Sequence, residues 1–267
     1  MLKTGVKKEV NIFRLMLMFL AGLTLLFIIA PLLSLILHTS PDSIIEAAVD
    51  KEVSSSIWLT IWTSMLATFI LSFAAIPLAY LMARHNFRFK RLISGIIDLP
   101  IVIPHSAAGI AVLSVISRDS IVGQSAEVFG LTLVGNPTGI MIAMAFVSLP
   151  FLINASSDGF RSVPVRLEHA AQNLGATPLR VFFTISLPLA WKNIVSGYIM
   201  MFARGMSEFG AVIIVAYHPM ITPILIFERF GAFGLKYARP VAVLFIGVCL
   251  VFFILLRYLT RHKNKHA

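Results

Sequence analysis

Long apolar stretches separated by short polar ones fill almost the whole chain. Six of them are apolar enough to form membrane helices, since about 20 helical residues cross the roughly 30 Å hydrocarbon layer of a bilayer. They cover residues 12–37, 57–83, 99–116, 139–155, 194–216 and 240–256. The third contains Pro100 and Pro104, and the fourth contains Pro150. Membranes tolerate such prolines where neighbouring protein or water satisfies the freed backbone groups, so these two spans are expected to line a cavity.

The composition agrees with a membrane protein. Apolar residues make up 58% of the chain and charged residues 13%, and the mean hydropathy is +0.90. A soluble globular protein has about 25% charged residues, so this chain has too little polar surface to cover a water-soluble particle. We therefore expect an all-α, polytopic membrane protein with a single transmembrane domain over residues 1–267. The one cysteine, Cys249, excludes an internal disulfide framework.

Basic residues cluster at alternate ends of the predicted spans. The clusters are Lys3, Lys7, Lys8 and Arg14; Arg84, Arg88, Lys90 and Arg91; Arg161, Arg166, Arg180 and Lys192; and Arg257, Arg261, Lys263 and Lys265. Cytoplasmic loops of membrane proteins are enriched in Lys and Arg. Both chain termini and the loops after spans two and four are therefore expected in the cytoplasm. The loops after spans one and three are predominantly acidic and are expected outside.

The loop after the fifth span departs from this charge trend. It carries Arg229, Lys236 and Arg239 with one acid, Glu228, yet the alternation of the spans places it outside. Two interpretations remain open. A positive vestibule would attract an anion or an acidic docking partner, whereas basic side chains at a membrane interface also extend towards water without further function.

Several motifs of catalytic sites are missing from the sequence. It has no Gly-x-x-x-x-Gly-Lys-Ser/Thr phosphate loop, no His-Glu-x-x-His and no Gly-x-Ser-x-Gly. We therefore expect no catalytic residue, no metal site and no cofactor held by this chain. The pI near 10.1 does not indicate a nucleic-acid partner, because the basic residues lie beside long apolar runs. A membrane protein without catalytic residues is most simply a transport pathway that another protein drives.

The loop between spans four and five has the most specific pattern. Residues 162–188 read SVPVRLEHAAQNLGATPLRVFFTISLP, in which Pro164 suits the first turn of a helix. One apolar face at helical spacing consists of Leu167, Ala170, Ala171 and Leu174. Gly175 suits a left-handed helix end, and Thr177 with Pro178 starts a second helix. The sequence thus predicts a helix, a sharp turn and another helix in the cytoplasm, which serve either as a docking element or as a folded linker.

This loop resembles the permease signature of ATP-binding-cassette importers: Glu-Ala-Ala, three residues, Gly, nine residues, Ile, one residue, Leu-Pro. The matching residues are Ala170, Ala171, Gly175, Ile185, Leu187 and Pro188. At the acid of the signature the chain has His169, with Glu168 one residue earlier. The resemblance implies a type I importer permease fold and a coupling segment that docks on a separate ATPase subunit, where ATP and Mg²⁺ bind. It assigns the coupling to Glu168, His169, Ala170, Ala171, Leu174, Gly175, Ala176 and Pro178.

Two further stretches narrow the resemblance to one branch of these permeases. Residues 203–244 and the third-span sequence LPIVIPHSAAGIAVL resemble permeases of molybdate and tungstate importers, especially archaeal ones, and more distantly those of sulfate and thiosulfate importers. The resemblance implies a prokaryotic, archaeal-type cell-membrane subunit that forms a homodimer. Its other implied partners are two ATPase subunits and an external oxyanion-binding protein.

Three alternatives to a molybdate or tungstate permease remain open. A sulfate or thiosulfate permease lies within the same family. An ion-coupled secondary transporter needs coupling acids near the bilayer midplane, where the sequence offers only Glu208. A membrane-bound enzyme needs a catalytic cluster, and the sequence has none of the catalytic motifs named above.

One pair of opposite charges lies inside a predicted span. Arg204 and Glu208 are four residues apart and hence on one helix face, and an unpaired charge in lipid is costly. The pair either locks span five as a structural ion pair or belongs to the pathway, with Glu208 anchoring a gate. In the second interpretation the translocation pathway and gate consist of Pro104, His105, Ser106, Arg204, Ser207, Glu208 and Gly210. Ser106 and Ser207 would donate neutral hydrogen bonds, and His105 is expected to be a hydrogen-bonded packing residue rather than a ligand.

Overall fold

The computed structural model describes residues 12–261, which form helices joined by short connections and contain no strand. The helices are α1 (Ile12–Leu37), α2 (Pro41–Val49), α3 (Lys51–Arg84), α4 (Lys90–Val102), α5 (His105–Ile116), α6 (Ile121–Val128), α7 (Pro137–Ser162), α8 (Val165–Asn173), α9 (Pro178–Val181), the π-helix η1 (Phe182–Ser186), α10 (Leu187–Met206), α11 (Gly210–Val215), α12 (Thr222–Phe233) and α13 (Leu235–Arg261). The predicted terminal charge clusters fall partly on Lys3, Lys7, Lys8, Lys263 and Lys265, which lie outside the described residues.

Four predicted spans are continuous helices. α1, α3, α7 and α13 are each long and apolar enough to cross a membrane. α1 has the predicted limits, whereas the other three helices extend beyond the predicted stretches 57–83, 139–155 and 240–256. The difference arises because helical backbone hydrogen bonding continues past the apolar residues into flanking polar ones.

The third and fifth predicted spans are each made of two helices rather than one. α4 and α5 meet at an angle of 114°, so residues 99–116 cover the end of one helix and the whole of another. Pro104 causes this break, because proline disfavours helical backbone at the preceding residue, and Ile103 has an extended conformation (φ −70°, ψ 147°). Within 194–216, α10 ends at Met206 and α11 begins at Gly210.

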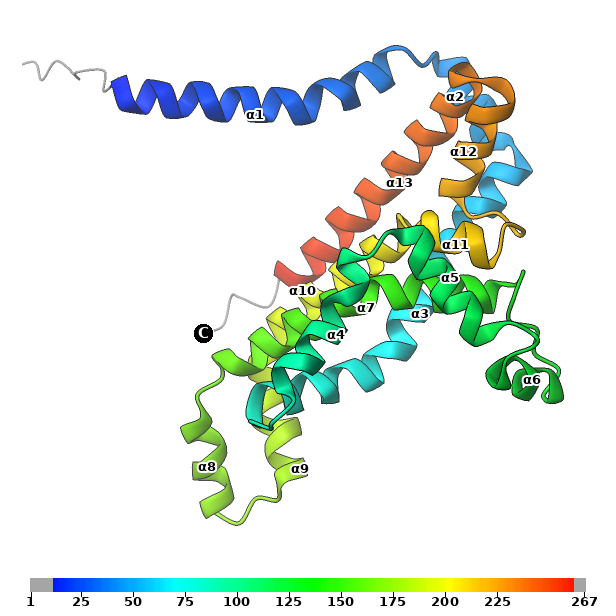
Figure 1. The fold of residues 1–267 in the computed structure, drawn as a ribbon. Coiled ribbons are helices and arrows are strands. Elements are labelled where there is room, and N and C mark those ends of the chain that lie inside the picture. The colour runs from blue at the N-terminus through cyan, green and yellow to red at the C-terminus, as the bar shows by residue number, and fades with distance from the viewer. Residues whose placement is uncertain (1–11, 262–267) are drawn as a thin grey trace, which may run out of the picture.

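α3, α7 and α10 pack side by side at the centre of the molecule (Figure 1). Their contact is lined by small and aliphatic side chains: Ala67, Ala75, Leu152, Ile194 and Met201. Small side chains allow helix backbones to approach closely, which is the main source of packing energy in a bilayer. α5 and α11 pack on each other and on α7 beside this centre, so the two broken spans meet.

α1 projects away from the other helices (Figure 1). None of its side chains is buried, and its main contact is with α13. Because α1 is apolar on all sides, with a mean hydropathy of 2.6, lipid or another protein chain must cover it.

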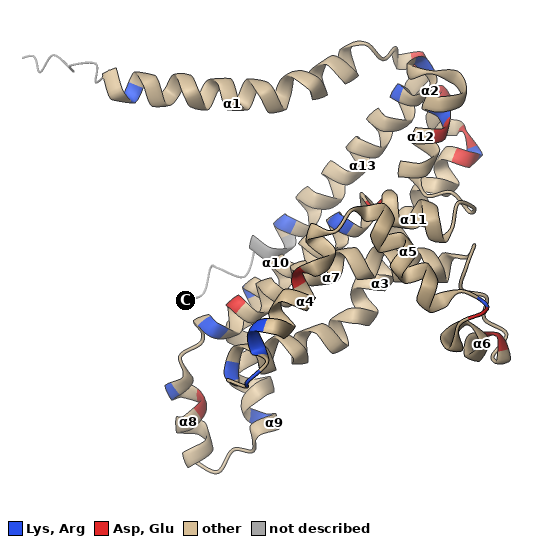
Figure 2. Ribbon diagram, viewed as in Figure 1, with Lys and Arg blue, Asp and Glu red and all other residues tan. Residues whose placement is uncertain are grey.

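Charged residues gather at the two ends of the helices (Figure 2). Basic residues surround the start of α4, the end of α7 and the α8–α9 projection, and residues of both signs lie at α2 and α12. Arg229 of α12 joins segments from two loops, because its Nη2 atom lies 2.6 Å from Oδ2 of Asp50 and 3.1 Å from Oε2 of Glu52. The loops after spans one and five therefore lie at the same end of the molecule, as the alternation of the spans predicts.

Candidate functional site

A cluster of three ionisable side chains lies where the two broken spans meet. Nη2 of Arg204 lies 2.8 Å from Oε2 of Glu208 and 2.9 Å from Nε2 of His105, and Nδ1 of His105 lies 3.3 Å from the same carboxylate oxygen. Nη1 of Arg204 also donates to the hydroxyl of Ser207 at 3.4 Å. The predicted ion pair is thus present, and His105 contacts both of its members.

The backbone around Glu208 differs from the expected continuous helix. α10 ends at Met206, so Arg204 and Glu208 do not share one helix, and Glu208 lies in the break at residues 207–209. Its Oε1 atom accepts the backbone N–H of Ala211 at 2.8 Å and thereby satisfies a free donor at the start of α11. The Glu208 side chain is 1% exposed, so this carboxylate is held inside the protein by the helix break and by Arg204.

The predicted pathway residues lie together in the structure. Gly210 allows the close approach of the two broken spans, because a Cβ atom at this position would lie 2.6 Å from Cβ of His105. Four of the predicted pathway residues are exposed in the single chain: Pro104, His105, Ser106 and Ser207. An exposed polar surface inside an otherwise apolar helix layer must face water or protein rather than lipid. The arrangement therefore suits the wall of a polar passage.

The segment of residues 162–188 has the predicted helix-turn-helix form. α8 begins directly after Pro164, and Gly175 follows it with a φ of +87°, in the left-handed region. The hydroxyl of Thr177 accepts the N–H of Arg180 at 3.4 Å and caps α9, which begins at Pro178. α8 and α9 project beyond the body of the molecule (Figure 1). They present apolar side chains to solvent, including Leu174, which is 91% exposed.

A buried ion pair joins this segment to the membrane helices, and sequence reasoning missed it. Arg84, at the end of α3, donates from Nε to both oxygens of Glu168 at 2.9 and 3.0 Å and from Nη2 to Oε1 at 2.6 Å. Oε1 also accepts the hydroxyl of Ser186 at 2.7 Å, and Nη2 of Arg84 donates to the carbonyl of Val163 at 3.1 Å. Glu168 therefore faces its own chain, whereas the neighbouring His169 is exposed. The only sequence signal for this pair was that Glu168 stands one residue before the position of the acid in the permease signature.

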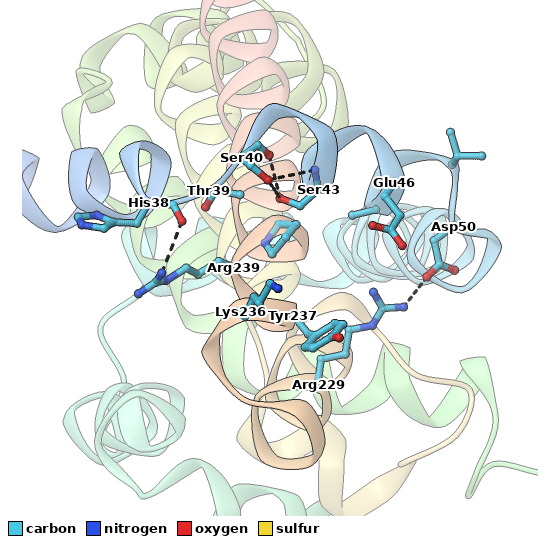
Figure 3. Close-up of a pocket in the computed structure, with 13 residues that line it drawn as sticks. His38, Thr39, Ser40, Ser43, Glu46, Asp50, Arg229, Lys236, Tyr237 and Arg239 are labelled. Carbon is cyan, nitrogen blue, oxygen red and sulfur yellow. Dashed lines mark hydrogen bonds and ion pairs between the residues drawn. The ribbon is translucent and has the colours of Figure 1, made fainter.

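A pocket of about 860 Å³ opens at the other end of the molecule, between α2 and the start of α13 (Figure 3). Lys236 and Arg239 line it, and the only polar contact of either within residues 12–258 is a long one from Nη1 of Arg239 to the carbonyl of His38 at 3.5 Å. Arg229 also lines the pocket, and its hydrogen bond holds the pKa of Asp50 below the ordinary value. The basic residues of the fifth loop thus converge on one pocket, which suits the attraction of an acidic group.

Sequence comparison with known proteins agrees with this geometry. Residues 75–265 match the family of binding-protein-dependent transport system inner membrane components. The chain belongs to this family. It is accordingly a multi-pass cell-membrane protein and a transport permease subunit.

The permease has close relatives among archaeal proteins. It is 40% identical over 90% of its length to 94% of the molybdate/tungstate transport system permease protein of Methanocaldococcus jannaschii. It is 38% identical over 90% of its length to 92% of the corresponding protein of Pyrococcus abyssi. A probable sulfate transport system permease protein of Chlorokybus atmophyticus is 30% identical over 84% of this chain and 80% of its own length.

Solved structures of other importers share the fold of the permease. A bacterial ABC transporter involved in the import of the acidic polysaccharide alginate superimposes with a TM-score of 0.73, covering 95% of this chain and 96% of that chain at 18% identity. The MetNI methionine ABC transporter has a TM-score of 0.58, covering 78% and 92% of the two chains at 15% identity. The chain therefore has the type I ABC importer permease fold.

Proposed function

We propose that this permease is the membrane-spanning subunit of an ATP-driven importer of molybdate and tungstate. The observation that carries the proposal is the identity of 38–40% to archaeal molybdate/tungstate permeases over about nine-tenths of the chain. Permeases described as probable sulfate transporters are 29–30% identical over a similar length. Sulfate or thiosulfate is therefore the alternative substrate.

The coupling segment is the proposed contact with the ATPase subunits, which bind ATP and Mg²⁺. The apolar residues Leu174, directly after α8, and Leu179, in α9, favour a protein partner because both side chains are exposed. The Arg84–Glu168 pair supports a mechanical link, since it ties α8 to the end of α3 and, through Ser186, to the start of α10. A displacement of the docked segment would therefore move two membrane helices at once.

The remaining partners are a second copy of the chain and an external oxyanion-binding protein. An apolar α1 without a buried side chain supports a homodimer, in which the partner copy covers part of this helix. The pocket lined by Lys236 and Arg239 supports docking of an acidic surface of the binding protein. A solved alginate transporter of the same fold is described in complex with a periplasmic protein. In such an assembly, closure of the ATPases would open the passage between the two copies alternately to each side.

The proposal is tested with proteoliposomes that contain the permease, its ATPase and its binding protein. We expect ATP-dependent uptake of molybdate or tungstate that exceeds uptake of sulfate at least tenfold. Uptake of sulfate at an equal or higher rate would assign the permease to the sulfate branch. Uptake that continues without ATP in an imposed ion gradient would instead identify a secondary transporter.

A further inference from the structure

The cluster of Arg204, His105 and Glu208 lies level with the interior of α3, a helix long and apolar enough to cross a membrane. Ser64 donates a hydrogen bond to the carbonyl of Phe202 at 2.7 Å, which places the end of α10 opposite this residue of α3. Ser64 is the fourteenth of the 34 residues of α3, so it lies about 20 Å from the outer end of that helix and about 30 Å from its cytoplasmic end, at roughly 1.5 Å per residue. Discontinuous membrane helices that meet near the middle of a bilayer commonly form substrate sites.

Arg204 has unused hydrogen-bond donors in this position. A guanidinium group carries five N–H donors, and the contacts of Arg204 within the described residues involve Nη1 and Nη2 but not Nε. The side chain is 23% exposed, and it lies beside the exposed residues His105, Ser106 and Ser207. A planar guanidinium suits recognition of oxyanions because it donates two parallel hydrogen bonds to two oxygens.

The start of α5 adds further donors next to Arg204. No side chain caps this 12-residue helix, and the first backbone N–H with an acceptor is that of Ala108, which donates to the carbonyl of Pro104. The preceding N–H groups, at His105, Ser106 and Ala107, are those that a helix leaves without an internal partner. Such groups and the positive end of the helix dipole favour an anion.

Glu208 weakens the attraction of this positive site for an anion but leaves donors of Arg204 available. Its Oε1 atom is occupied by the N–H of Ala211. Its Oε2 atom is buried and accepts no hydrogen bond of good geometry, although it lies 2.8 Å from Nη2 of Arg204. Arg204 is therefore held by charge and by its contacts with His105 and Ser207 rather than by a two-pronged carboxylate bridge. A transport site must bind its substrate weakly enough to release it, and a neighbouring carboxylate has this effect on a dianion.

We infer that Arg204, His105, Ser106 and the start of α5 form a binding site for a tetrahedral oxyanion in the passage. Glu208 acts there as a competing carboxylate that promotes release. This inference rests on the proposed function, because it places the substrate of the importer in the permease itself. In a structural ion pair, by contrast, loss of the Arg204 charge and loss of the Glu208 charge would impair the protein equally.

Binding is measured on the purified permease–ATPase complex without the binding protein, using radiolabelled tungstate as the probe. We expect saturable binding to the wild-type complex and at least tenfold weaker binding to Arg204→Gln. Glu208→Gln keeps the shape of the side chain and the acceptor for Ala211, and we expect at least threefold tighter binding with slower uptake. Arg118→Gln removes an exposed positive charge from the outer loop and should bind as the wild type does.

Each outcome of this experiment decides the inference. Co-purification with the ATPase shows whether each variant assembles, and the double variant Arg204→Gln/Glu208→Gln leaves no single buried charge, so it should assemble and still fail to bind tungstate. Absence of binding to the wild-type complex, or undiminished binding to the double variant, would overturn the site. Weaker binding to Glu208→Gln would identify a structural pair instead. ATP-dependent uptake by the wild type with its binding protein tests the proposed function separately, so the site can fail while that function stands.

Discussion

Gly175 is the residue at which the backbone of the coupling segment turns. Its φ of +87° lies in the left-handed region, and a Cβ atom placed on it would meet nothing within 4 Å. Valine is therefore strained there by its backbone alone, at about 1–3 kcal/mol. We expect Gly175→Val to change the direction of α9 and to lower oxyanion-stimulated ATP hydrolysis by the reconstituted complex about tenfold or more, since about 1.4 kcal/mol corresponds to a factor of ten.

Two variants control for this effect. Gly175→Asn should retain most of the activity, because asparagine tolerates the left-handed region better than other residues with a side chain. The second control is Gly95→Ala. Gly95 lies in α4, where the added methyl group also meets nothing within 4 Å and φ is not positive. This variant should leave ATP hydrolysis unchanged. Full hydrolysis by Gly175→Val would show that the turn does not set the coupling geometry.

Arg84 and Glu168 form the most extensively hydrogen-bonded buried pair in residues 12–258, with side chains 9% and 6% exposed. Removing one member of a buried pair costs about 3–5 kcal/mol, because the other charge remains without compensation. We expect Arg84→Gln to lower the thermal unfolding temperature of the purified permease and to accelerate amide hydrogen exchange in α8. Arg84→Lys should cause a smaller loss, since it keeps the charge but not the two-pronged contact.

The matched control for this pair is Arg161→Gln. Arg161 contacts Asp158 at 3.1 Å, but their side chains are 53% and 66% exposed, so this pair contributes little to stability. Equal effects of Arg84→Gln and Arg161→Gln on unfolding and exchange would contradict the role of the buried pair as the attachment of α8.

At the scale of elements, the contact that attaches α8 to the membrane helices lies apart from the apolar surface that the segment exposes. Glu168 faces the membrane helices, whereas Leu174 at the other end of the segment is 91% exposed. Leu174→Asp should therefore leave the fold of the permease unchanged. In a docked complex it should weaken association with the ATPase at least tenfold, because burying a leucine contributes about 1.5–3 kcal/mol.

Leu131→Asp provides the comparison, since Leu131 is a half-exposed leucine of the outer connection before α7. Both variants are expected to elute as the wild-type permease does in size-exclusion chromatography. Association with the ATPase, measured by titration in detergent, should change for Leu174→Asp only. Unchanged association of both variants would mean that the segment is a linker rather than a docking element.

At the scale of the whole molecule, the two ends of the helices should lie on opposite sides of the membrane. Ser162, at the end of α7, and Ser125, in α6, are both exposed and both donate to a carbonyl of their own helix. In a Cys249→Ala background, an impermeant thiol reagent added to intact cells should label Ser125→Cys and not Ser162→Cys. Labelling of both after membrane disruption controls for accessibility, and the reverse pattern in intact cells would invert the topology.

The sequence by itself determined which stretches are apolar enough to span a membrane, which loops carry clustered basic residues, and where the segment between α8 and α9 turns. Each of these features depends on neighbouring residues: the length of an apolar stretch, the charge of a short loop, or a glycine that follows a helix. The same local information pointed to Pro104 as a disturbance of the third span. It did not show the break after Met206, where no proline or glycine interrupts residues 206–209.

Only the tertiary structure decided which distant groups meet. Arg84 and Glu168 are 84 residues apart, and His105 and Arg204 are 99 residues apart, so no periodicity connects either pair. Whether a charged side chain contacts a partner protein or its own chain depends on the face of the helix that the fold buries, and this is why Glu168 points inward while His169 is exposed. Burial of a charge is tolerated only where a partner is supplied. The partner of Glu168 comes from a helix that packing alone brings close, whereas Glu208 pairs with Arg204 four residues away and packing adds only His105.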